Sequence, residues 1–296
     1  MSKKQSKRIH IPLEEKPSEF KIDTDESDIT LPAVIVFSGC RGSGKTYSCI
    51  IFMRHFEIKK YVNRTFLISP TRHSNDVYSN LKTLKPEDCF TDNKTFQQAL
   101  QHIMIVVADD WTKYRANKEY AKIYQKWVST PHKLNIHEEM IIERMGGVRP
   151  QRVVKPSHLL VIDDAQGTDM YSHSKKDALT HMIIKHRHIP ITVALLAQSW
   201  TGIPRTIRLN TTQFAIFKTG DKTQLKQIYD TFANTIPYEE FELIYKEAVS
   251  KPHGFLFIDT IPKKEYKRFR SSFNEFLVPQ SESGSITQIK KKSKKS

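Results

Sequence analysis

The stretch from Ala33 to Phe56 constrains the fold more than any other part of the sequence. It reads AVIVFS, then GCRGSGKT, then YSCIIFMRHF. The first six residues are mostly apolar and partly β-branched, which predicts a buried strand, and the last ten predict a helix. The eight residues between them fit the pattern G-x-x-x-x-G-K-[ST], which is typical of a loop that binds phosphate groups.

The residue types of this loop suit that chemistry. Backbone N–H groups surround phosphate oxygens there, and glycine is needed where a side chain would obstruct them. We expect Lys45 to reach the β- and γ-phosphates and Thr46 to hold Mg²⁺, while the helix N-terminus adds partial positive charge. The alternative is a glycine-rich turn that binds nothing, which the strand before and the helix after disfavour. The predicted nucleotide-binding residues are Gly39, Cys40, Arg41, Gly42, Ser43, Gly44, Lys45 and Thr46.

Two apolar runs further along the chain end in paired aspartates, and the first is IMIVVADDW. It resembles the strand that carries a metal-binding carboxylate. However, the apolar residues from Phe96 to Tyr114 recur at steps of three and four, which is the spacing of one helix face. We therefore predict a helix over residues 95–128, with Asp109 and Asp110 on its solvent side. A metal-binding strand is the alternative.

The second run, HLLVIDDAQ, lacks helical spacing and has the length of a central parallel strand. Asp163 at the end of this strand is expected to contact Mg²⁺ through water beside Thr46. Asp164 lies where a carboxylate can orient or deprotonate the attacking water. The alternative is a strand that ends in a solvated Asp-Asp turn.

A third apolar run, Ile191 to Ala197, predicts another buried strand, which ends in Gln198. The amide of Gln198 can hydrogen-bond the γ-phosphate or the attacking water and so respond to the state of the nucleotide. It can equally be a hydrogen-bonding group of the loop, and the sequence does not separate the two. A basic turn with Arg205 and Arg208 follows.

Composition limits the partners and the compartment. The 296 residues carry a net charge of +15, with a pI near 9.6, which suggests a polyanionic partner such as nucleic acid. Three irregularly spaced cysteines predict reduced thiols. Neither a membrane-spanning apolar run nor a signal-peptide core is present in the sequence, so we expect a soluble intracellular protein.

The predicted organisation is a disordered polar N-terminal arm over 1–30, an ATPase domain over 31–278 and a disordered basic tail over 279–296. A helical and irregular insertion at about 95–157 interrupts the domain, with a short helix near 138–144. The remaining predicted strands are 65–69, 213–218 and 255–259, with a hairpin after 261, and the remaining predicted helices are 75–84, 174–188, 222–232 with Asp221 as its cap, and 238–249.

These elements alternate as β then α, which predicts a doubly wound, mainly parallel α/β sheet. The glutamine-tipped strand after the Asp-Asp strand is typical of RecA-like, additional-strand P-loop ATPases. The ordered motifs resemble the genome-packaging ATPases of large DNA viruses and virophages, of poxvirus type, in the FtsK–HerA superfamily. The resemblance spans about 32–276 and is carried by GCRGSGKT, TFLISPT, LLVIDDA, KHRHIPITVALLAQSWTGIPRTIRLNTTQFAIFK and FLFID.

The resemblance implies an ATP- and Mg²⁺-dependent motor that acts as a ring, a pentamer or hexamer, and threads double-stranded DNA into a preformed capsid. It further implies a capsid, portal or membrane-associated procapsid partner and a location in the host cytoplasm or viral factory, or in the virion. The family's arginine finger, which completes a neighbouring subunit's site, would fall on Arg187, with Arg208 or Arg205 as alternatives. Arg187 could instead compensate the dipole of its helix.

One residue departs from the family's pattern. Many superfamily members have Glu after the metal-binding Asp, whereas this chain has the shorter Asp164, so Asp164 is either not the base or holds the water through an intermediate. Three alternatives remain open: a DNA helicase or DNA-transfer ATPase, a P-loop kinase for a small acceptor, and a DNA-binding protein whose nucleotide site is only structural.

Overall fold

A ten-stranded sheet forms the centre of the computed structural model, which describes residues 22–72, 76–166, 168–171, 177–185, 190–278 and 287–290. The strand order is β10-β9-β8-β7-β6-β1-β5-β4-β2-β3. The strands are β1 (Val34–Ser38), β2 (Arg64–Ile68), β3 (Leu84–Phe90), β4 (His158–Ile162), β5 (Ile191–Ala197), β6 (Gln213–Phe217), β7 (Phe255–Asp259), β8 (Phe269–Ser271), β9 (Glu275–Val278) and β10 (Thr287–Lys290).

The strands from β6 to β3 run parallel, and β7 to β10 continue the sheet as antiparallel neighbours. Strand β5 pairs with β1 on one side and β4 on the other. An additional strand therefore separates the phosphate-loop strand from the Asp-Asp strand, which confirms the predicted fold class. Parallel alignment also brings the carboxyl ends of β1, β5, β4 and β2 to one edge of the sheet.

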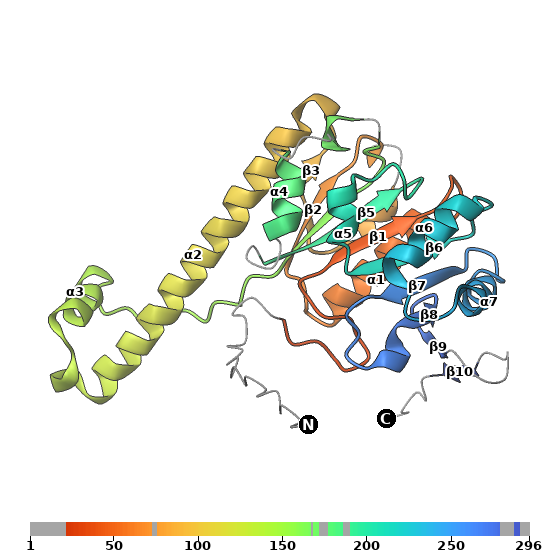
Figure 1. The fold of residues 1–296 in the computed structure, drawn as a ribbon. Coiled ribbons are helices and arrows are strands. Elements are labelled where there is room, and N and C mark those ends of the chain that lie inside the picture. Colours follow the sequence, from red (N-terminus) through yellow and green to blue (C-terminus); the bar gives the residue numbers. More distant parts are fainter. Residues whose placement is uncertain are drawn as a thin grey trace, which may run out of the picture.

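Helices cover both faces of the sheet because the central strands are buried on both sides. Helix α1 packs in one apolar cluster, and α2, α4, α5, α6 and α7 contribute to the cluster on the other face (Figure 1). The helices are α1 (Lys45–Ile58), α2 (Phe96–Ser129), α3 (Ile136–Arg144), α4 (Ala178–Lys185), α5 (Arg205–Leu209), α6 (Lys222–Phe232) and α7 (Tyr238–Ala248), with short 3₁₀ turns η2 (Asp76–Asn80), η3 (Asn93–Thr95), η4 (Pro131–Lys133), η5 (Asp169–Tyr171) and η6 (Glu265–Lys267). In the described part of the chain, every helix is too short or too polar to cross a membrane.

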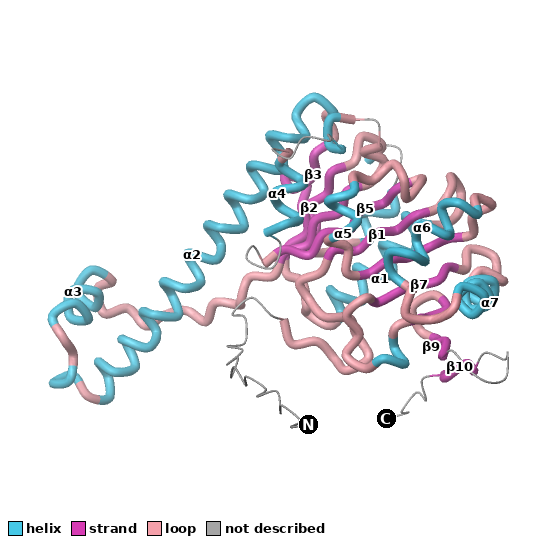
Figure 2. The backbone as a smooth tube through the Cα atoms, viewed as in Figure 1, coloured by secondary structure: helices cyan, strands magenta, loops and turns pink. Residues whose placement is uncertain are grey.

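Helix α2 confirms the helical interpretation of the first Asp-Asp run, but of its two aspartates only Asp109 faces solvent as predicted, because Asp110 pairs with Arg64 and His158. Its first half packs on the sheet through the predicted face, which includes Phe96, Ile103 and Trp111. Its second half extends beyond the sheet, with α3 at its far end, and an extended segment returns to β4 (Figure 2). Tyr120 and Ile123 of α2 form a small separate core with Ile142 of α3.

The structure differs from the prediction in two segments, one at the β2–β3 edge of the sheet and one near the N-terminus. The helix expected over 75–84 is the short turn η2, and the strand β3 follows it unpredicted. Pro86 argued against a strand in this segment, but β3 lies at the edge of the sheet, where a strand tolerates a proline. Residues 22–30 were expected to belong to the disordered N-terminal arm, but they pack on the domain. Ile29 is buried, and Asp28 accepts hydrogen bonds from Tyr61 and His55.

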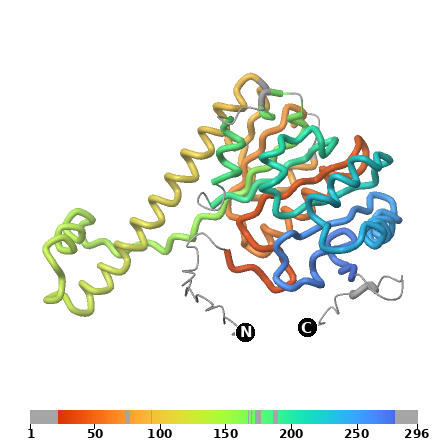
Figure 3. The backbone as a smooth tube through the Cα atoms, in the orientation of Figure 1, coloured from red at the N-terminus to blue at the C-terminus, as the bar shows by residue number. Residues whose placement is uncertain are grey.

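The N-terminal segment lies beside the chain's C-terminal part (Figure 3). The Lys263 ammonium donates to the Thr24 carbonyl oxygen at 2.8 Å, and the Lys267 ammonium donates to the Glu26 carbonyl oxygen at 2.7 Å. The predicted hairpin is present as β8 and β9. Of the predicted tail, 279–296, only β10 belongs to the described residues, and residues 1–21 lie outside them.

Candidate functional site

The predicted phosphate loop joins β1 to α1, and its glycines meet specific requirements. Gly44 has φ of 94° and Gly42 has φ of 78°, a region that side-chain-bearing residues rarely adopt. A Cβ at Gly39 would lie 2.6 Å from the Cβ of Phe217, so only glycine fits against β6. Helix α1 begins at Lys45 directly after the loop, so its N-terminus is available to an anion.

Lys45 lies across the loop that precedes it. Its ammonium group donates to the carbonyl oxygens of Gly39 at 2.7 Å and Cys40 at 2.9 Å. Partial burial lowers the pKa of Lys45, and the carboxylates of Asp163 and Asp164 oppose that shift. The cation is thus held close to the two predicted catalytic carboxylates.

Thr46 and Asp163 come together across the sheet. The Thr46 hydroxyl donates to Oδ2 of Asp163 at 3.2 Å, although 117 positions separate them in the chain. Asp163 is 2% exposed, and this burial raises the pKa of its carboxyl group. A hydroxyl and a carboxylate are hard oxygen ligands, so the pair fits Mg²⁺.

Tyr78 is a site residue that the sequence did not reveal. Its hydroxyl donates to the same Oδ2 of Asp163, and burial raises its own pKa so that it remains protonated. The residue comes from η2, where a helix was expected. Since no local pattern marks it, only the packing of η2 against α1 and the hydrogen bond to Asp163 identify it.

Asp164 is exposed and adopts a left-handed backbone conformation with φ of 53°. Strained backbone of this kind is common at functional sites. Oδ2 of Asp164 accepts a hydrogen bond from the Thr71 hydroxyl at 3.0 Å. Thr71 follows β2, which pairs with β4 in parallel, so the strand order, had it been known, would have placed it here.

Gln198 is exposed at the tip of β5, at the same edge as the phosphate loop. Ser38 pairs with Ala197, which places Gln198 beside Gly39. The backbone N–H of Gln198 donates to Oε1 of Gln166 at 2.7 Å, and Nε2 of Gln166 donates to the Ser199 carbonyl oxygen at 3.2 Å. Gln166, which the sequence analysis missed, therefore links the loop after β4 to the loop after β5.

The structure describes two of the three candidate arginine fingers. Arg187 lies outside the described residues. Arg205 begins the short helix α5 and is exposed. The Arg208 guanidinium lies 5.3 Å from the centre of the Trp200 ring, and burial lowers its pKa, with Arg205 adding to the shift. The structure thus places Arg208 against the domain's own core rather than at its own phosphate loop.

A cavity of about 510 Å³ adjoins the phosphate loop on the side of β7. Tyr47 and Ile51 of α1 line it together with His253 and Phe273. Nδ1 of His253 lies 3.2 Å from the Ser43 carbonyl oxygen, so the loop before β7 touches the phosphate loop. Aromatic and aliphatic walls beside a phosphate site suit a planar base.

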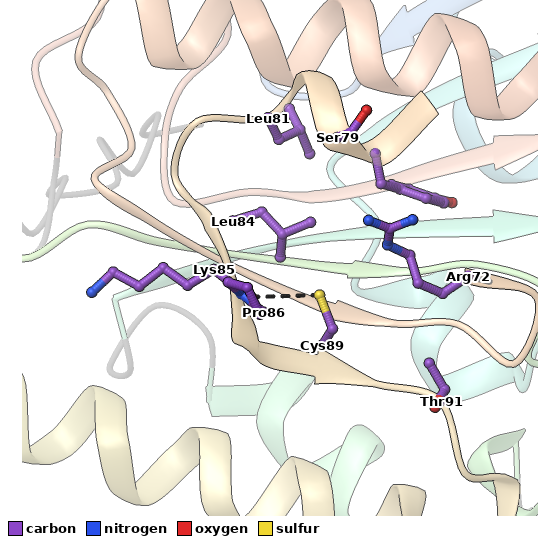
Figure 4. A pocket seen from close by; sticks show the side chains of 9 residues that line it. Arg72, Ser79, Leu81, Leu84, Lys85, Pro86, Cys89 and Thr91 are labelled. Carbon is purple, nitrogen blue, oxygen red and sulfur yellow. Dashed lines mark hydrogen bonds between the residues drawn. The ribbon is translucent and has the colours of Figure 1, made fainter. Parts of the chain in front are cut away.

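A second cavity, of about 480 Å³, lies at the β2–β3 edge (Figure 4). The Arg72 guanidinium lies 5.9 Å from the ring centre of Tyr78, which lines this cavity. Cys89 points toward the backbone of Lys85, with its sulfur 3.5 Å from that carbonyl oxygen. The cavity therefore borders the Tyr78 side of the carboxylate site.

Comparisons with known proteins give low sequence identity throughout. No family model matches the sequence. The chain is 21% identical over 231 residues to the uncharacterized protein L437 of Acanthamoeba polyphaga mimivirus, a match that covers 78% of this chain and 66% of that protein, just under two thirds of its length.

Solved structures that resemble the fold include a nucleotide complex of the genome packaging NTPase B204 from Sulfolobus turreted icosahedral virus 2, at 14% identity and a TM-score of 0.46, covering 77% of this chain and 92% of that one. The pCW3 conjugation coupling protein TcpA is similar at 15% identity and a TM-score of 0.40, covering 94% and 66%.

Proposed function

We propose that this protein hydrolyses ATP and uses the energy to move double-stranded viral DNA into a preformed capsid. One observation supports the nucleotide site above all others. The phosphate-loop Thr46 and the strand-terminal Asp163 meet at 3.2 Å, with β5 inserted between their strands. A phosphate loop and a buried carboxylate so joined have the composition of a site for phosphoryl transfer to water.

Each residue has a proposed role at that site. The backbone N–H groups from Gly39 to Gly44 hold the phosphates, and Lys45 offsets their charge. Thr46 and Asp163 hold Mg²⁺, which when bound neutralises charge on the β- and γ-phosphate oxygens. Asp164 orients the attacking water or accepts its proton.

The choice of ATP and the response to its hydrolysis follow from neighbouring groups. The cavity between α1 and His253 takes the base. The side chain of Gln198 contacts the γ-phosphate or the water, and the link from its backbone to Gln166 transmits the change to the loop after β4. Arg187, Arg208 or Arg205 of a neighbouring copy completes the site in a ring, and of the two that the structure describes, Arg205 is the exposed one.

The DNA and capsid parts of the proposal are supported by charge and by the motif series. The net charge of +15 suits a phosphate polymer better than a small substrate. The ordered motifs from the phosphate loop to FLFID resemble viral packaging ATPases rather than P-loop kinases. The capsid or portal component, or a membrane-associated procapsid, and an intracellular site of assembly complete the proposal.

The experiment is a phosphate-release assay with and without long duplex DNA, together with analysis of the products. We expect free phosphate, stimulation by duplex DNA, and loss of hydrolysis in a folded Lys45→Ala variant. A phosphorylated acceptor would indicate a kinase, and strand displacement on a forked duplex would indicate a helicase. Hydrolysis that duplex DNA does not change at any protein concentration would contradict the motor.

A further inference from the structure

The second half of α2, helix α3 and the segment that returns to β4 project together from the sheet (Figures 1 and 2). We call residues 112–157 the arm. The arm contains ten lysines and arginines and four acidic residues, so its net charge is +6. The sheet domain, residues 22–111 and 158–278, has 26 basic and 24 acidic residues and a net charge of only +2. Positive charge is therefore concentrated on the arm.

Three of the five basic residues of α2 in the arm lie on one face. Arg115, Lys118 and Lys122 follow one another at steps of three and four, so they form one stripe along the helix. All three are exposed. Tyr120 and Ile123 point to the other side, where they pack against α3. The stripe therefore faces away from the arm's small core.

The returning segment adds cations next to this stripe. Lys155 lies 5.9 Å from the centre of the Trp111 ring, and the Arg115 guanidinium lies 5.7 Å from the centre of the same ring. Arg149 and Arg152 are exposed further along the segment. Lys155 and Arg115 thus meet at Trp111, and the returning segment carries further exposed cations beyond them.

Two other basic residues of the arm are excluded because carboxylates neutralise them. Lys113 pairs with Asp109 at 2.7 Å, and Lys126 pairs with Glu138 at 2.5 Å. Within the part of the chain that the structure describes, Lys118 and Lys122 have no carboxylate within ion-pair distance. Their charge is available to an external anion.

We propose that this basic stripe of the arm binds the phosphate backbone of duplex DNA, an inference that rests on the proposed motor function. The stripe continues with the polar Gln125 and Ser129, whereas a protein-binding surface has an apolar centre. The 18 residues from Thr112 to Ser129 are about 27 Å long at 1.5 Å per residue, about three quarters of one turn of duplex DNA. Backbone contacts carry no sequence information, which suits a motor that moves along any sequence.

The experiment compares two double variants of the full chain. The arm variant is Lys118→Gln and Lys122→Gln. The control variant is Lys82→Gln and Lys222→Gln, which removes the same charge from exposed positions of the sheet domain. Fluorescence anisotropy of a labelled 30-base-pair duplex measures affinity over a range of salt concentrations, and circular dichroism checks the fold.

We expect the arm variant to bind duplex DNA at least about tenfold more weakly at 0.1 M salt, because it loses phosphate contacts. Each lost contact should also make the negative slope of log affinity against log salt shallower by about 0.9. The loss should be the same for duplexes of different sequence. The control variant should bind like the wild type, and hydrolysis without DNA should be unchanged in both.

The possible failures are distinguishable. A wild type that does not bind duplex DNA would overturn both this inference and the motor. Wild-type binding with equal affinity in the arm variant would overturn the arm's role alone. The same anisotropy measurement with labelled polyglutamate tests the other source of negative charge: if the arm variant loses binding to polyglutamate and keeps its binding to duplex DNA, the arm binds an acidic protein surface instead.

Discussion

Two pairs of adjacent aspartates follow similar apolar runs, and the structure places them at opposite ends of one strand. Oδ2 of Asp110 accepts a hydrogen bond from Nε2 of His158, the first residue of β4, at 3.0 Å. Asp163 follows the last residue of the same strand. The rise of β4 puts about 17 Å between the backbone of His158, which binds Asp110, and that of Asp163. Asp110 fastens a helix to the sheet, and Asp163 and Asp164 belong to the proposed nucleotide site.

The difference between the pairs lies in their partners. Asp110 is paired with Arg64 at 3.4 Å and with His158, so its charge is used within the fold. The hydrogen-bond donors to Asp163 are the neutral hydroxyls of Thr46 and Tyr78. Because neutral hydroxyls donate these hydrogen bonds, they do not neutralise the charge of the Asp163 carboxylate, and a metal ion can do so. Sequence periodicity separated the helix from the strand, but only the partners show what each carboxylate does.

Replacement of the metal-site carboxylate should have the largest effect. Asp163→Asn should reduce ATP hydrolysis about 10³-fold, because the metal's charge stabilisation of several kcal/mol depends on it. The folded protein should not lose stability, since burial raises the pKa of Asp163 and the ionised form is therefore a cost to folding at neutral pH. Phosphate release with Mg²⁺ present measures the loss of hydrolysis, and thermal unfolding in EDTA measures the stability of the protein without metal. A variant that unfolds at a much lower temperature would assign Asp163 to the fold.

Its neighbour tests the catalytic half of the comparison. If Asp164 is the base, Asp164→Asn should slow a single turnover of hydrolysis about 10²-fold while nucleotide affinity is unchanged. Thr71→Val serves as a control that removes the Thr71 hydroxyl, with its hydrogen bonds to Asp164 at 3.0 Å and Ser69 at 3.3 Å, and leaves the Asp164 carboxylate in place. A single-turnover rate equal to that of the wild type would exclude Asp164 as the base.

The structural pair should behave in the opposite way. Asp110→Ala should lower the free energy of unfolding by about 1–3 kcal/mol, because Arg64 and His158 lose a charged partner. Urea denaturation measures this loss. Hydrolysis per folded molecule should be unchanged, and a selective loss of hydrolysis would show that Asp110 acts in the catalytic site after all.

The pH dependence of stability should show the contribution of His158. Burial lowers the pKa of His158 below its ordinary 6.5. The unfolded chain therefore takes up this proton first, and stability that is present above about pH 6.5 is lost as the pH falls, by at most about 1.4 kcal/mol per pH unit. Urea midpoints at pH 7.5 and 5.5 should fall further apart in the wild type than in His158→Gln. Equal pH dependence would exclude a buried neutral His158.

Asp109 should give the smallest effect. Its carboxylate is 55% exposed and pairs with Lys113 one helical turn away. Exposed pairs of this kind contribute little, so Asp109→Asn should change the melting temperature by less than about 2 °C. Calorimetry measures this change, and a larger one would mean that the two aspartates of α2 act together.

The sequence predicted the parts of the molecule whose patterns are local. The phosphate loop, the additional strand and the helical interpretation of α2 depend on spacings within a few residues, and all three are present. Strand β3 was missed because Pro86 is a valid argument against a central strand, and the edge position was not visible. Residues 22–30 were missed because their acidic side chains find partners only in the folded chain, such as Lys59 for Asp25.

The site was predicted less completely than the fold. Lys45, Thr46 and Asp163 belong to motifs, and the structure brings them together. Tyr78 and Gln166 come from segments without a motif, and they reach the site through the neighbouring order of β2, β4 and β5. The projection of the arm was also invisible, since the helix repeat does not say where the sheet ends.

The most direct measurement is the binding of Mn²⁺, in place of Mg²⁺, in the presence of an ATP analogue, followed by electron paramagnetic resonance. Wild type and Asp110→Asn should each bind one nucleotide-dependent Mn²⁺ per chain. Asp163→Asn should bind it about 10- to 100-fold more weakly, because Asp163 holds the metal through water. Equal Mn²⁺ affinity in Asp163→Asn and the wild type would contradict a metal site at the end of β4.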